Sequence, residues 1–96
     1  MYALVVRASI HDADRTREVL NRRVVPLASS APGFEVGYWT WPTAEGEPNA
    51  LAMIIFDSEE NARAAADRVS ANFSELEKSD DVTLDGVEVR EVVASA

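Results

Sequence analysis

Residues 53–66, with the sequence MIIFDSEENARAAA, decide the fold, because they join a strand directly to a helix. The apolar run over residues 50–56 is typical of a buried strand. Asp57 is the predicted N-cap of the helix, and Glu60 three residues later completes a capping-box-like pattern. Apolar side chains then recur at helical spacing over residues 58–73, at Ala62, Ala65, Ala66, Val69 and Phe73.

A second strand-to-helix unit precedes this one. Residues 2–10 are rich in β-branched and apolar side chains and predict a strand. Residues 13–29 predict an amphipathic helix, with Asp12 or Asp14 as its N-cap and a kink or a new short turn at Pro26. Further strands are predicted over residues 34–41 and 82–94, with a loop over 42–49 and a bulge or turn at Gly86.

The resulting order, β-α-β-β-α-β, predicts a ferredoxin-like α+β fold. We expect one domain over residues 1–96, with a four-stranded antiparallel sheet and two helices on one face, since each crossover is right-handed. In the strands at 2–10 and 50–56, both alternating sets of side chains are apolar. Two helices cover only one face, so we expect a homodimer in which a second copy covers the other.

The composition excludes several classes of protein. The 96 residues include no cysteine and one histidine, which excludes thiolate chemistry and multi-histidine metal sites. A net charge of −8 argues against nucleic acid and anionic membrane surfaces as partners. No apolar run approaches the length of a membrane helix, and no signal-peptide pattern opens the sequence. We therefore expect a cytoplasmic protein.

Several motifs resemble the dimeric α/β-barrel superfamily, which includes the antibiotic-biosynthesis-monooxygenase-like domains. They are YALVVR, VVPLASSAPGF, GYWTW, MIIFDSEENARAAA and VEVREVVA, and together they span nearly the whole chain. The resemblance implies that two sheets form a barrel across a dimer, with a ligand pocket between sheet and helices in each subunit. It implies no haem chemistry, because Val6 and Phe56 replace the asparagine and tryptophan of haem-degrading members and residues 58–73 contain no histidine. We expect no cofactor, as in the quinone-forming monooxygenases of the superfamily.

Four polar or aromatic side chains are candidates for function. His11 is the side chain suited to proton transfer near neutral pH, and Tyr38 offers a hydroxyl to a ligand; both also suit ordinary surface positions. Trp39 and Trp41 share one face of their strand. They suit a dimer interface, which we favour, or the wall of a pocket for an aromatic ligand.

The expected ligand pocket is apolar. In relatives, one side of the first and third strands faces the helices, which here places these residues along the pocket: Leu4, Val6, Ile54, Phe56, Ala62 and Ala66. Arg7 interrupts an apolar strand, and we expect it to pair with a carboxylate of the last strand. The arginines of residues 1–34 suit an anion site or, preferably, pairs within the helix such as Glu18 with Arg22.

Two functions fit these features. The first is a homodimeric protein that binds or transforms a small organic molecule, most suitably an aromatic one, as a cofactor-independent monooxygenase would. The second is a non-catalytic dimeric module that binds a metabolite or a partner. The polar content of the pocket distinguishes them, because catalysis needs a convergent donor or base.

Overall fold

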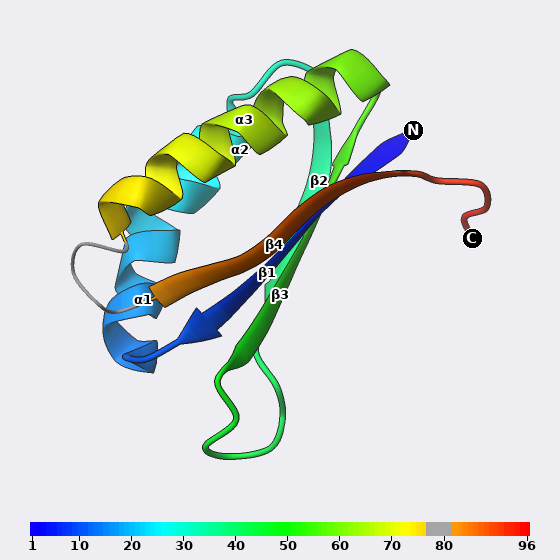
Figure 1. Cartoon of the computed structure of the whole chain (residues 1–96). Coiled ribbons are helices and arrows are strands. Elements are labelled where there is room, and N and C mark those ends of the chain that lie inside the picture. Colours follow the sequence, from blue (N-terminus) through cyan, green and yellow to red (C-terminus); the bar gives the residue numbers. More distant parts are fainter. Residues whose placement is uncertain (77–81) are drawn as a thin grey trace.

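The computed structural model describes residues 1–76 and 82–96 and has the ferredoxin-like α+β fold (Figure 1). Its strands form one antiparallel sheet in the order β2-β3-β1-β4. The strands are β1 (Tyr2–Ile10), β2 (Phe34–Thr40), β3 (Asn49–Phe56) and β4 (Val82–Glu91). The helical segments are α1 (Ala13–Val19), η1 (Leu20–Val24), α2 (Val25–Ser29) and α3 (Glu59–Leu76), and all of them lie on one face of the sheet (Figure 1).

Strand register assigns each side chain of β1 to a face. Leu4 lies opposite Ile54 of β3, and both point toward the helices, where Leu4 is fully buried. The next residue, Val5, lies opposite Met53 on the outer face. The helix-facing set forms the core together with Ala62 and Ala65 of α3. Within the part of the chain that is described, no helix is both long and apolar enough to span a membrane.

The first helical segment changes its hydrogen bonding just before Pro26. Asp12 caps α1, with its carboxylate accepting from the backbone N–H of Arg15 at 3.1 Å. In η1 the bonds lengthen to a π-helical turn, so that the N–H of Val25 donates to the carbonyl of Leu20. Pro26 then lies in the first turn of α2, where a missing N–H costs little. The expected interruption is thus a π-turn followed by a new short helix.

The turn before β2 and the start of α3 contact each other. Gly33 adopts a positive φ of 77°, and its carbonyl accepts from the N–H of Asp57 at 2.9 Å. The sequence predicted Asp57 as the N-cap of α3, and this prediction is wrong. Ser58 caps the helix instead, its hydroxyl accepting from the N–H of Asn61 at 3.2 Å, because α3 begins one residue later than expected. The Asp57 carboxylate accepts from the Asn61 side-chain amide at 2.8 Å.

The outer face of the sheet carries an ion pair. Arg7 donates to the Glu88 carboxylate of β4 at 2.6 Å, as expected, but both groups are exposed to solvent rather than buried. The guanidinium of Arg90 lies 3.3 Å from the same carboxylate. These two cations hold the pKa of Glu88 below its usual range, with the hydrogen bond from Arg7 as the larger cause. The predicted bulge at Gly86 is confirmed by a register shift in the pairing of β1 with β4.

Candidate functional site

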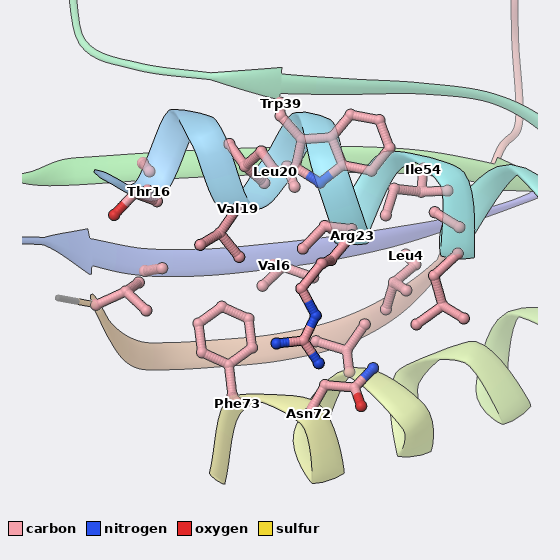
Figure 2. Close-up of a pocket in the computed structure, with 18 of the residues that line it drawn as sticks. Leu4, Val6, Thr16, Val19, Leu20, Arg23, Trp39, Ile54, Asn72 and Phe73 are labelled. Carbon is pink, nitrogen blue, oxygen red and sulfur yellow. The ribbon is translucent and has the colours of Figure 1, made fainter. Parts of the chain in front are cut away.

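A cavity of about 430 Å³ lies between the sheet and the helices (Figure 2). Most of its lining is aliphatic or aromatic, contributed by all four strands and all four helical segments. Interiors of small domains are normally close-packed, so a space of this size between sheet and helices is unusual. It falls in the size range of small-molecule binding sites, about 300–1,000 Å³.

The first helical segment forms one wall of the cavity. Its inward side chains follow helical spacing and include Thr16, Val19, Leu20, Val24 and Leu27. Of these, Thr16 is polar and buried, and its hydroxyl already donates to the carbonyl of Asp12 at 2.7 Å. This wall is therefore apolar along most of its length.

The sheet and α3 form the opposite walls. The lining includes Leu4, Val6, Ile54 and Phe56, and these apolar side chains form its floor (Figure 2 labels the first three). Among the alanines of α3, Ala65 lines the cavity. Ala62 is fully buried in the core beside the cavity, and Ala66 packs against that core.

Both tryptophans line the cavity. Trp39 lies opposite Ala52 on the helix-facing side of the sheet, and Trp41 joins it two residues later. Gly37 makes the placement of Trp39 possible, because a Cβ at that position would lie 3.0 Å from the six-membered ring of the indole. This arrangement favours the pocket-wall role that the sequence left open, and the dimer-interface role of both residues stays a prediction.

The two predicted catalytic residues lie outside the cavity. His11 follows β1 on the surface, with its Nε2 2.9 Å from the Thr83 hydroxyl. Tyr38 lies opposite Met53 on the outer face of the sheet, where its side chain is 63% exposed. Neither residue is part of the lining. Their catalytic roles stay predictions, and the polar groups of the cavity come from other residues.

Those polar groups are mainly arginines. Arg15, Arg23 and Arg68 line the cavity together with the amide of Asn72. Among the residues described, the lining contains no aspartate, glutamate, histidine or tyrosine. From the sequence, Arg23 is one of the arginines of residues 1–34 for which pairing within the helix is preferred to an anion site, although it occupies an inward position seven residues after Thr16 in a largely apolar stripe. This inward position in the helical stripe was the signal in the sequence that could have identified Arg23 as a lining residue.

The outer face of the sheet is a second feature. It exposes large apolar side chains in neighbouring strands, Val36, Tyr38, Leu51 and Met53, which we call the outer patch. These side chains point away from the helices, on the side of the sheet that no helix covers (Figure 1). A contiguous apolar surface of this kind commonly marks an interaction site.

Comparison with known proteins shows the fold. No protein-family model matches the chain, and no curated protein matches it. A variant of SnoaB, described as a cofactor-independent oxygenase from Streptomyces nogalater, superposes with a TM-score of 0.72 at 14% identity, covering 98% of this chain and 94% of that one. An ethyl tert-butyl ether D (EthD) family protein from Bacillus halodurans superposes with a TM-score of 0.62 at 17% identity, covering 97% of this chain and 100% of that one. The chain thus shares its ferredoxin-like α+β fold with both proteins, as the predicted order of its elements indicated.

Proposed function

We propose that this protein binds a small, largely apolar aromatic molecule in the cavity between its sheet and its helices. The observation that carries the proposal is the cavity itself, about 430 Å³ in volume and walled by aliphatic side chains and two tryptophans. A flat aromatic ring matches such walls, because it buries apolar area and stacks on the indoles. A few polar groups, from the first helical segment and from α3, provide orientation.

We also propose that two copies associate through the outer patch. The patch lies on the side of the sheet opposite the helices, and its exposed apolar side chains come from adjacent strands. A second copy about a two-fold axis would present the same patch and cover it. Sedimentation at micromolar concentration is expected to give about twice the chain mass of 10.5 kDa, whereas a folded monomer would contradict the proposal.

Cofactor-independent oxygenation is the first candidate for chemistry in this cavity. It is supported by the shared fold with SnoaB, a protein described as a cofactor-independent oxygenase. In such a reaction the ionised substrate supplies the electrons that reduce dioxygen. The residues of this chain would exclude water with their apolar walls, hold the ring against Trp39 and stabilise the substrate anion with Arg23.

Binding without catalysis is the second candidate, and a specific observation favours it. The described lining contains no carboxylate, imidazole or phenol that could remove a proton from the ligand. A general base must lie within hydrogen-bond reach of the proton that it removes. A binding module has no such requirement, so the lining as described suits it directly.

A matched pair of variants tests the binding site. Ala65 lines the cavity, whereas its neighbour Ala64 is exposed on the same helix. Phenols, quinones and aromatic acids are screened for a rise in melting temperature, because a ligand that prefers the native state must stabilise it. We expect Ala65→Leu to abolish the rise for any ligand found and Ala64→Leu to retain it. A screen in which no compound raises the melting temperature, or equal effects of the two variants, would refute the proposal.

Oxygen uptake separates the two candidate functions. A bound phenol that is consumed together with dioxygen, in the absence of added metal or flavin, indicates an oxygenase. A ligand that binds saturably in air and is recovered unchanged indicates a binding module. The same Ala65→Leu variant serves as the control, because it should eliminate any uptake that occurs in the cavity.

A further inference from the structure

We propose that Arg23 selects ligands that carry a carboxylate, so that the cavity takes aromatic acids in preference to neutral aromatic molecules. The inference rests on the proposed function, because it requires that the cavity be the ligand site. It adds the chemical class of the ligand and the residue that recognises it.

The position of Arg23 in its helix is the first observation. It shares the inward face of the first helical segment with Val19, Leu20 and Val24, all of which line the cavity. Its neighbour Arg22 is not part of the cavity lining and pairs with Glu18 one turn earlier, at 3.2 Å. Of the two adjacent arginines of η1, only Arg23 lines the apolar cavity.

The direction of its side chain is the second observation. Figure 2 shows Arg23 extending from η1 across the cavity toward α3, with its guanidinium directed toward Asn72 and Phe73. The opposite side of the cavity is bounded by Trp39 and the strands. A ligand whose ring lies against the indole could thus direct a polar group toward the guanidinium and the Asn72 amide.

The charge of the lining is the third observation. Acidic residues outnumber lysine and arginine in the chain by 17 to 9, yet the cavity reverses this balance. Three arginines line it, and no acidic side chain does so among the residues described. The described lining thus includes cationic side chains and no anionic one, which suits an anionic ligand.

Desolvation turns this charge into selectivity. Arg23 is exposed to solvent, and a ligand that fills the cavity removes water from its guanidinium. A carboxylate replaces that water with charge-assisted hydrogen bonds in the forked geometry that guanidinium favours. A neutral amide of the same shape removes the same water but offers the cation only an uncharged acceptor, which compensates less. The two ligands should therefore differ in affinity because of this residue.

The experiment compares two probes and three proteins. Naphthoate and naphthamide, substituted at the same ring position, have nearly the same shape and differ in charge. Their dissociation constants are measured by titration calorimetry with the wild-type protein, Arg23→Gln and the matched control Arg22→Gln. We expect the wild type to bind naphthoate at least about tenfold more tightly than naphthamide, a difference of about 1.4 kcal/mol. Arg23→Gln should remove this preference by weakening naphthoate alone, and Arg22→Gln should keep it.

Each result has a distinct meaning. If both probes bind with equal affinity, or if Arg23→Gln keeps the preference, the inference about Arg23 is wrong while the cavity remains the ligand site. If neither probe binds to the wild type, the proposed function fails and the inference fails with it. Arg23→Lys adds a second check, because it keeps the charge and should retain part of the preference even if the glutamine variant folds poorly.

Discussion

Replacing Gly33 with alanine should destabilise the protein by two separable effects. The first is conformational, since the positive φ of 77° at this residue costs an L-amino acid about 1–2 kcal/mol. The second is steric, because the new Cβ would overlap the Asp57 carboxylate and the Asn61 amide. Moving those groups apart sacrifices their 2.8 Å hydrogen bond, worth about 1 kcal/mol. We therefore expect a total loss of about 2–3 kcal/mol in the free energy of unfolding.

Gly46 provides the matched control for this experiment. Its φ of 85° is also positive, but a Cβ there would meet nothing within 4 Å. Gly46→Ala should thus show only the conformational cost. In urea unfolding, its free energy of unfolding should be about 1 kcal/mol higher than that of Gly33→Ala. A second control removes the obstacle: in an Asp57→Ala background, Gly33→Ala should cost less than in the wild type. Equal losses for the two glycine variants, together with no coupling to Asp57, would refute the reasoning.

Three further predictions concern the outer patch, the ion pair and the cavity wall. Met53→Glu places a carboxylate in the outer patch, where Met53 is 42% exposed, and sedimentation should show association weakened by at least about 2 kcal/mol while the circular dichroism spectrum is retained. Glu88 should contribute stability above pH 4.5, its ordinary pKa, and this stability should be lost as the pH falls through its lowered pKa in the folded protein. Arg7→Met should shift the pKa of Glu88 upward in an NMR titration. An unchanged pKa would contradict Arg7 as the larger cause of the shift. Gly37→Ala should displace the indole of Trp39 and change the tryptophan emission spectrum, whereas an identical spectrum and unchanged ligand affinity would show that the indole does not depend on this glycine.

The sequence predicted β1 and β3 well because apolar side chains dominate both segments, whereas the strand predicted over residues 82–94 ends earlier, at Glu91. The strand predicted over residues 2–10 matches β1 at both ends. The N-terminal end of α3 was harder to place by pattern. Its predicted N-cap was wrong by one residue, because Asp57 and Ser58 are both good capping residues. Local chemistry identifies the junction between strand and helix, and the tertiary contact with Gly33 decides which side chain takes each role.

The site was less accessible to sequence reasoning. Spacing places Trp39 and Trp41 on one face, but the other face of the same strand also carries apolar side chains, so only the pairing with β3 assigns the tryptophans to the helix side. The alanines of α3 are chemically alike, so the pattern does not distinguish Ala65 from its neighbours as the lining residue. Arg23 was obscured because pairing within the helix explains arginines in general, and it does explain Arg22.

The π-turn of η1 has a consequence for how this cavity could diverge. A π-turn holds one residue more than the α-helical turn it replaces, so it is equivalent to a single-residue insertion in a regular helix. Deleting one residue between Leu20 and Val24 would restore α-helical bonding through this turn, so that α1 and α2 keep their facing and only the side chains within the turn are reassigned. The sheet, α3 and the outer patch lie outside this turn, while the side chains of η1 that face the ligand would change. A change of one codon's length is therefore enough to alter ligand preference on an otherwise constant scaffold.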